Sequence, residues 1–311
     1  LVVALGGNAL LQRGQSPDAE TQQANVRTAV ASIAALARTH ELVVTHGNGP
    51  QVGILAVESD SDPALTRPYP LDVLGAETEG MVGYWLQREL ANALRGRRVA
   101  TLLTQTLVQV DDPAFLDPQK FIGQVYDATT AHRLAAERGW TVRPVGPYWR
   151  CVFPSPRPVG IVELTSIRAL LGIGTVVICA GGGGVPVVDT VNGRRGVEAV
   201  VDKDRASALL AHQLDADALL MLTDVGAVEL EYGTPAARPI RSATSAQLRE
   251  LAFPAGSMAP KIEAACDFVD GGGRFAAIGA LEDAFALAEG TAGTIITSQP
   301  AHPLHQLVAR V

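Results

Sequence analysis

The sequence predicts an α/β protein, a three-layer α/β/α sandwich in which helices cover both faces of a mainly parallel central sheet. Apolar runs rich in β-branched residues lie within residues 1–10, 41–53 and 175–188, and each run ends in a glycine cluster. Continuous runs of this kind are typical of strands buried on both faces of a parallel sheet. A proline-rich and aromatic stretch at 111–160 is too long for an ordinary connection, so we expect a small protruding subdomain there.

Strands and helices are expected to alternate along the chain. Strands are predicted within 1–10, 41–53, 99–110, 175–188, 218–230 and 274–281. Helices are predicted over 21–40, 77–96, 128–139 and 261–272. In the first helix, Val26, Val30 and Ile33 fall on one stripe, as the helical period of 3.6 residues requires of a core-facing side. Gly139 is expected to end the third helix as a C-cap glycine.

The composition limits the class of protein. With 311 residues, 47% of them hydrophobic and 18% charged, the chain can bury one large domain or two lobes, and long disorder is excluded. A net charge of −7 argues against a general nucleic-acid binder. Three widely spaced cysteines make neither a disulfide framework nor a zinc pattern, which favours a reducing compartment. No apolar run reaches membrane-spanning length and no basic leader is visible, so we expect a cytoplasmic protein without membrane partners.

Three glycine clusters follow predicted parallel strands, and their backbone N–H groups could bind an anion. The cluster residues are Gly6, Gly7, Asn8, Gly47, Asn48, Gly49, Gly182 and Gly183. One cluster alone is as well explained by a tight turn that needs a positive φ. Because open α/β sheets bind ligands at the carboxyl ends of their strands, three clusters together predict a phosphate site. Neither a P-loop motif nor the protein-kinase signatures are present.

Lysine is rare in this chain. Of the 25 lysine and arginine residues only Lys120, Lys203 and Lys261 are lysines. Lysine supplies the compact point charge that arginine does not. Lys203 and Lys261 are expected in the first turns of helices, where a cation opposes the helix dipole unless an anion binds there. Solvated side chains that tolerate this small penalty remain the alternative, and position alone suggests that Lys120 is an exposed loop lysine.

Two carboxylates flank Lys203. Asp204 is predicted to be the N-cap of a helix that starts near Arg205. The aspartates could also position the lysine or hold a metal ion, and the role of Asp202 stays open between structure and function. Glycine turns, helix starts and lysines together predict phosphoryl transfer, which mainly requires positioning and charge neutralisation.

In this order, the segments resemble the carbamate kinases of the amino-acid kinase superfamily. The motifs that carry the resemblance include VVALGGNAL, VVTHGNGPQVG, PLDVLGAETEGMVGYWLQ, ICAGGGGVPVV, GVEAVVDKDRASALLA and GSMAPKIEAA. The resemblance implies reversible phosphoryl transfer between Mg²⁺-bound ATP and carbamate, which gives carbamoyl phosphate and ADP and often runs toward ATP. It implies an acceptor lobe over 1–213 with a protruding subdomain at about 115–158, a nucleotide lobe over 214–311, and a cytoplasmic homodimer.

The resemblance also assigns roles to residues. It implies that Lys120, Lys203 and Lys261 are catalytic and that Asp204 organises the lysines. The clusters at Gly6–Asn8 and Gly47–Gly49 correspond to the carbamate and phosphate cradle. The residues implied at the nucleotide are Thr223, Asp224, Tyr232, Gly233 and Met258. No protein metal site is implied, because Mg²⁺ is carried by the nucleotide.

The chain departs from the family pattern in the subdomain. Phe121–Gln124 replaces the usual Pro-Ile-Gly-Pro, and Gly146–Tyr148 lacks the arginine that usually precedes Trp149. Two alternatives remain open. A kinase for another small acceptor, such as acetylglutamate, would need an arginine clamp that we cannot assign near the glycine clusters. Retention of all three lysines argues against a catalytically silent nucleotide sensor.

Overall fold

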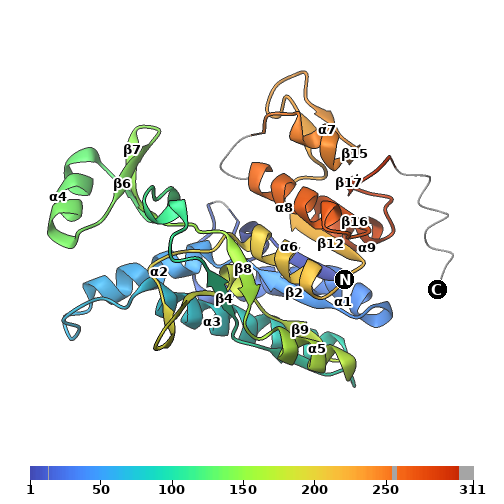
Figure 1. Cartoon of the computed structure of the whole chain (residues 1–311), viewed down its shortest axis with the longest axis horizontal. Coiled ribbons are helices and arrows are strands. Elements are labelled where there is room, and N and C mark those ends of the chain that lie inside the picture. The colour runs from blue at the N-terminus through green and yellow to red at the C-terminus, as the bar shows by residue number, and fades with distance from the viewer. Residues whose placement is uncertain (13, 254–257, 301–311) are drawn as a thin grey trace.

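An eight-stranded sheet forms the centre of the computed structural model, which describes residues 1–12, 14–253 and 258–300 (Figure 1). The strand order is β15-β17-β16-β12-β1-β2-β9-β3, and every neighbouring pair is parallel except β16 with β17. The strands are β1 (Val2–Leu5), β2 (Val43–His46), β3 (Val99–Thr101), β9 (Val176–Ile178), β12 (Ala218–Thr223), β15 (Ser242–Thr244), β16 (Phe275–Ala280) and β17 (Thr294–Thr297). The predicted mainly parallel sheet is confirmed.

Helices pack on both faces of this sheet and form two hydrophobic cores. One core contains side chains of α1 (Ala19–Thr39), α3 (Leu71–Ala93) and α9 (Ala284–Ala288). The other contains side chains of α5 (Leu164–Gly172), α6 (Lys203–Gln213), α7 (Ser245–Arg249) and α8 (Met258–Asp270). Successive residues of β1 alternate between the cores, with Val3 and Leu5 in the first and Val2 and Ala4 in the second. The three-layer sandwich is therefore confirmed.

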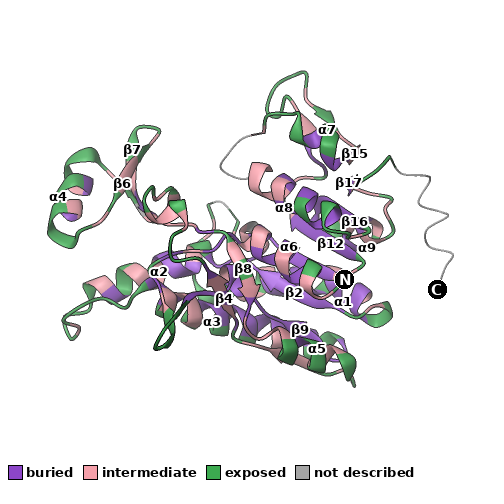
Figure 2. Ribbon diagram, viewed as in Figure 1, coloured by how far each residue is buried: buried purple, intermediate pink, exposed green. Residues whose placement is uncertain are grey.

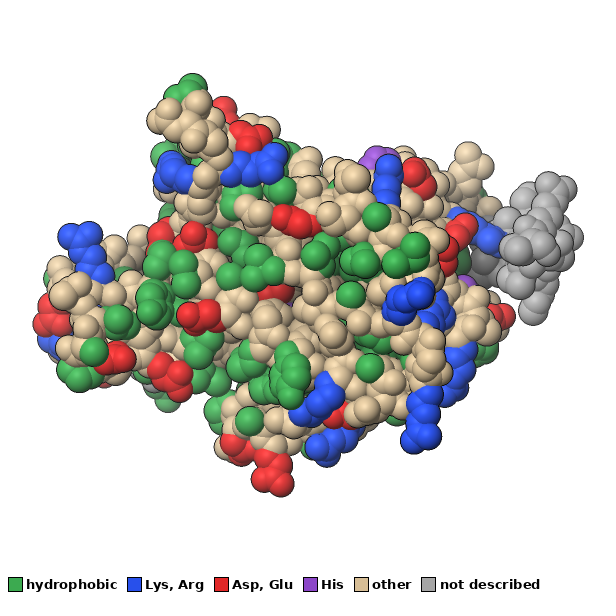
Figure 3. All heavy atoms as spheres, turned by 90° about the horizontal axis from the view of Figure 1, so that it is seen from below, with side chains coloured by type: hydrophobic (Ala, Val, Ile, Leu, Met, Phe, Trp, Pro, Cys, Tyr) green, Lys and Arg blue, Asp and Glu red, His purple; other side chains and the backbone are tan. Residues whose placement is uncertain are grey.

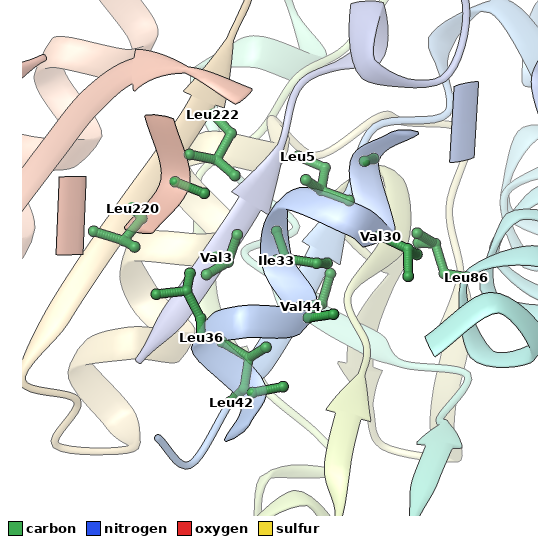
Figure 4. Close-up of a cluster of buried hydrophobic side chains, with 14 of the residues drawn as sticks. Val3, Leu5, Val30, Ile33, Leu36, Leu42, Val44, Leu86, Leu220 and Leu222 are labelled. Atoms are coloured by element: carbon green, nitrogen blue, oxygen red, sulfur yellow. The ribbon is translucent and has the colours of Figure 1, made fainter. Parts of the chain in front are cut away.

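The first core shows how the sequence periodicity becomes packing. Val30 and Ile33 of α1 lie against Val3 and Leu5 of β1, and Leu86 of α3 closes the cluster (Figure 4). Most strands of the central sheet are buried, and the edge strands β3 and β15 are less so, whereas the helices expose their outer sides (Figure 2). Among the described residues, no helix combines the length and apolar character needed to cross a bilayer.

The structure contains a second, four-stranded sheet, and the prediction of one continuous strand over 99–110 was wrong. The segment 99–110 divides into β3 and β4 (Gln105–Val108), which belong to different sheets. The chain changes sheets at Thr104, whose backbone and hydroxyl group bond to residues outside both strands. β4 lies between β8 (Pro158–Ile161) and β10 (Val185–Thr190), and β11 (Gly193–Gly196) completes this sheet.

The predicted protruding subdomain is present. It consists of β5 (Lys120–Tyr126), α4 (Ala128–Arg138), β6 (Val142–Val145) and β7 (Tyr148–Phe153), with strand order β5-β7-β6. It extends away from the central sheet (Figure 1). Gly139 adopts a left-handed conformation with φ of 69° and ends α4, as predicted. The ring of His132 packs on that of Trp149, with centroids 4.5 Å apart, which fixes α4 on β7.

The remaining elements complete the connections. α2 (Gly49–Ser61) follows β2 and packs on β5, and β13 (Glu229–Leu230) pairs with β14 (Arg238–Pro239). Helices α3 and α8 begin at Leu71 and Met258, earlier than the predicted 77 and 261. Lys261 is therefore the fourth residue of α8 and still lies in its first turn. Residues 301–311, most of the C-terminal tail, lie outside the described part of the chain.

Phe268 offers a test of the second core, where it is 1% exposed. We expect Phe268→Ala to lower the free energy of unfolding by about 3–5 kcal/mol, because it removes a buried ring and leaves a cavity. Phe285→Ala is the matched control, since Phe285 is 47% exposed and should cost far less. Urea unfolding followed by circular dichroism measures both, and equal losses would contradict this assignment of the core.

Candidate active site

The three glycine clusters meet at one edge of the central sheet. They follow β1, β2 and β9, which are adjacent and parallel. A Cβ atom on Gly47 would lie 3.2 Å from the Cα atom of Gly7, and one on Gly182 would lie 2.2 Å from the Nδ2 atom of Asn48. The turns therefore pack directly on one another, as their positions in the sequence predicted.

The turn after β9 requires glycine for two separate reasons. Gly182, Gly183 and Gly184 have φ values of 65°, 98° and 82°, a region that other L-residues rarely adopt. A Cβ atom on Gly183 would also lie 2.4 Å from the carbonyl oxygen of Val201. The turn thus lies against the segment that leads into α6, which brings this glycine cluster beside Lys203.

One carboxylate joins two of the three lysines. The Nζ atom of Lys203 donates to Oδ1 of Asp204 at 2.6 Å, and that of Lys261 donates to Oδ2 at 2.8 Å. Lys203 is the first residue of α6 and Lys261 lies in the first turn of α8, and these two helices pack together. The side chains of both lysines are less than 15% exposed. The two ammonium groups therefore converge from the starts of two helices.

The N-cap of α6 differs from the prediction. The helix begins at Lys203, so Asp202 is its N-cap and accepts the backbone N–H groups of Asp204 and Arg205 at 3.0 and 3.3 Å. The prediction of Asp204 as N-cap was wrong, because the helix starts two residues earlier than expected. The carboxylate of Asp204 is directed to Lys203 and Lys261 instead. The other oxygen of Asp202 accepts from Lys120 Nζ at 2.7 Å, which links the subdomain to α6.

Burial and ion pairing oppose each other in this cluster. Burial alone would raise the pKa of Asp204, but the ammonium groups of Lys203 and Lys261 outweigh it and hold the pKa well below its usual range. The pKa of Asp202 is lowered in the same way, with Lys120 as the main opposing charge. Burial lowers the pKa of Lys203, against the stabilising charge of Asp204. Three ammonium groups face two carboxylates, so the cluster has a net positive charge suited to an anion.

The residues predicted at the nucleotide lie at the end of β12 or after it in the chain. Thr223 ends this strand, which neighbours β1, and its hydroxyl group donates to Asp224 at 3.1 Å. Tyr232 is 63% exposed, and Gly233 has a φ of 78°. Met258 begins α8, three residues before Lys261. The backbone of Asn8 lies in the turn after β1, but its side chain lies outside the described part of the structure.

Two buried ionisable residues of this edge were missed by the sequence analysis. His46 ends β2; burial lowers its pKa to about 4, and its Nε2 atom has no hydrogen-bond partner among the described residues. Glu79 of α3 is 1% exposed, and burial raises its pKa to about 8. The signal for Glu79 is its place on the apolar stripe of α3, with Val82 and Leu86. A carboxyl group in such a stripe needs polar partners.

No three acidic, histidine or cysteine side chains of the described residues are grouped so as to hold a metal ion. The polar groups that are present suit an anion: backbone N–H groups of glycine turns, two helix starts and lysine ammonium groups. The site as a whole therefore has the chemistry of a phosphate-binding centre.

Comparison with known proteins identifies relatives of the chain. The profile of the amino acid kinase family matches residues 1–279. A carbamate kinase of Rhizobium meliloti (strain 1021) is 50% identical over 302 residues, covering 96% of this chain and 93% of the relative. A carbamate kinase of Escherichia coli (strain K12) is 48% identical over 297 residues, covering 96% and 99%.

Solved structures similar to this chain include a carbamate kinase as well. The carbamate kinase from Giardia lamblia bound to AMP-PNP has a TM-score of 0.88 and 36% identity, covering 95% of this chain and 97% of its own. An N-acetylglutamate synthase from Neisseria gonorrhoeae has a TM-score of 0.58 at 16% identity and shares the fold alone. The family profile, the identity over nearly the whole chain and the shared architecture lead to one conclusion: the chain belongs to the amino acid kinase family.

Proposed function

We propose that this protein is a carbamate kinase, which transfers a phosphoryl group reversibly between ATP and carbamate to give carbamoyl phosphate and ADP. The observation that carries the proposal is the pair of ammonium groups that Asp204 holds beside the glycine turns. Relatives named carbamate kinase are 50% and 48% identical to this chain over nearly its whole length, which supports carbamate as the acceptor.

The proposed chemistry is direct in-line transfer. Carbamate is an anionic nucleophile, so the enzyme needs no general base to activate it. The glycine turns bind the acceptor and the transferred group through backbone N–H groups, and the lysines neutralise the charge of the phosphoryl group. A lysine about 4 Å from a phosphate oxygen is worth about 4 kcal/mol at an effective dielectric constant of 20.

We assign the two substrates to different parts of the chain. Residues 1–213 bind the acceptor, with Gly6, Gly7, Gly47 and Gly49 as the cradle, and Gly182 and Gly183 complete it. Residues 214–311 bind the nucleotide through Thr223, Asp224, Tyr232, Gly233 and Met258. Mg²⁺ enters with the phosphates of ATP or ADP, which supply its ligands. Lys120, from the protruding subdomain, closes the site over the transferred group.

We further propose that the protein is a cytoplasmic homodimer. The lower side of the molecule exposes hydrophobic side chains across its middle (Figure 3). Tyr84 of α3 is 57% exposed and Leu103, just after β3, is 48% exposed. Tyr84 and Leu103 line one shallow hollow on the surface, so this part of α3 is our candidate for the contact between subunits.

The activity is tested by a coupled assay for ATP formed from carbamoyl phosphate and ADP. We expect turnover by the wild type and a loss of about 1000-fold in Lys203→Ala, because about 4 kcal/mol of charge stabilisation disappears. Arg38→Ala serves as a control, since Arg38 is exposed in the last turn of α1. Folded wild-type protein that forms no ATP would refute the function, and near-normal turnover in Lys203→Ala would refute the role of that lysine.

A second prediction concerns pH. In Asp204→Asn the two ammonium groups lose their shared counter-charge, so the pKa of Lys203, already lowered by burial, should fall further. Lys203 must be protonated to bind phosphate, so the alkaline limb of the activity profile should move to lower pH. Measuring kcat/KM from pH 6 to 9.5 checks this, with circular dichroism to verify folding. An alkaline limb at the wild-type position would show that Asp204 does not maintain the lysine charge.

A further inference from the structure

We propose that Glu79 is a positioning residue for the phosphate-binding turn at Gly181–Gly183, an inference that rests on the proposed function. The Oε1 atom of Glu79 accepts the N–H of Gly181 at 2.8 Å, and Oε2 accepts the N–H of Thr104 at 3.1 Å. One buried carboxyl group thereby joins the middle of α3 to the glycine turn and to the chain that enters β4.

The glycine turn depends on such contacts because its own backbone is permissive. Three successive glycines with positive φ can adopt many conformations, and fixing them costs conformational entropy. Thr104 supports the same turn, since its hydroxyl group accepts the N–H of Ala180 at 2.9 Å. Glu79 thus fixes Gly181 directly and fixes Thr104, which in turn holds Ala180. Removing the carboxyl group frees both attachments at the start of the turn.

The residue before Glu79 anchors a second glycine cluster. The hydroxyl group of Thr78 accepts from Nδ2 of Asn48 at 2.8 Å, and the Asn48 side chain lies against Gly182. Two consecutive residues of α3, Thr78 and Glu79, therefore fix the positions of the turns after β2 and β9 relative to each other. This arrangement explains why a carboxyl group occupies the apolar stripe of α3.

The charge state of Glu79 matters because the group lies behind an anion site. Burial raises its pKa to about 8, although the N–H groups of Thr104 and Gly181 lower it. The ionisable groups around it do not neutralise a charge there. Burial keeps His46 neutral and raises the pKa of the Cys179 thiol, while Glu163 adds a negative charge. The charge of Lys203 in α6 contributes to the lowered pKa of His46, and Lys203 is already paired with Asp204.

A neutral Glu79 places no negative charge behind the bound phosphate. Above about pH 8 its ionisation introduces one, and the repulsion should weaken binding of anionic substrates. We therefore expect the KM of the wild type for carbamoyl phosphate to rise between pH 7 and pH 9. The signature is a change in KM rather than in kcat, because the repulsion acts on the bound substrate as well as on the transition state.

Three variants test this role. Glu79→Leu removes both acceptors, and Glu79→Gln keeps one acceptor and cannot ionise. Glu77→Gln makes the same substitution on the exposed side of α3. In Glu79→Leu we expect a KM for carbamoyl phosphate at least tenfold higher and faster hydrogen exchange at the amides of Gly181 and Thr104. In Glu79→Gln we expect the KM at pH 7 to exceed that of the wild type by less than in Glu79→Leu. This KM should not increase further between pH 7 and pH 9. Glu77→Gln should keep the wild-type pH profile.

A readout without substrate separates this inference from the proposed function. The folded-state pKa of Glu79 lies above its unfolded value of about 4.5, so the folded state binds more protons between these values. The free energy of unfolding of the wild type, relative to Glu79→Gln, should therefore fall as pH rises from 5 to 8. The inference is overturned if Glu79→Leu exchanges these amides at wild-type rates. It is also overturned if Glu79→Gln retains the wild-type rise in KM or the wild-type dependence of unfolding on pH.

Discussion

The site depends on the carboxylate of Asp204, which accepts the ammonium groups of Lys203 and Lys261 on its two oxygens. Burial lowers the pKa of Lys203, and the nearby ammonium group of Lys261 acts in the same direction, against the charge of Asp204. The carboxylate provides a counter-charge to both ammonium groups within the protein itself. It also leaves the cluster with a net positive charge once Lys120 and Asp202 are included. In the proposed reaction, a phosphoryl group in transfer would therefore meet charges that are already in place, with no reorganisation required at the moment of reaction.

Two aspartates separated by one residue also connect three parts of the chain. Asp202 binds Lys120 of the protruding subdomain, and Asp204 binds Lys261 of α8. Both aspartates lie at the start of α6, and the Asp202 side chain additionally caps that helix. The residues that organise charge are thus the residues that set the relative positions of these parts. A change of charge at one aspartate should alter geometry as well as electrostatics.

Much of this was predictable from the sequence, for identifiable reasons. Apolar strands followed by glycine clusters gave the sheet and the shared edge of Gly7, Gly47 and Gly182, because both follow from backbone periodicity. The rarity of lysine in the chain identified Lys203 and Lys261 as candidate site residues. The N-cap was misassigned because Asp202 and Asp204 are chemically equal candidates, and only the start of α6 distinguishes them. Glu79 was missed because its partners, the amides of Gly181 and Thr104, are distant in sequence and carry no residue-type signal.

The net charge of −7 would by itself repel the proposed anionic substrates, but most of the negative charges lie too far from the site to act on it. Exposed carboxylates are screened within about 8 Å at physiological ionic strength, whereas charges in a partly buried cluster are screened much less. The side chains of Lys203 and Lys261 are 12% and 14% exposed, so their fields would act on the proposed phosphate group in a low-dielectric environment. Local burial rather than total charge thus determines which ligand the site attracts. The same burial makes an uncompensated negative charge behind the glycine turn costly.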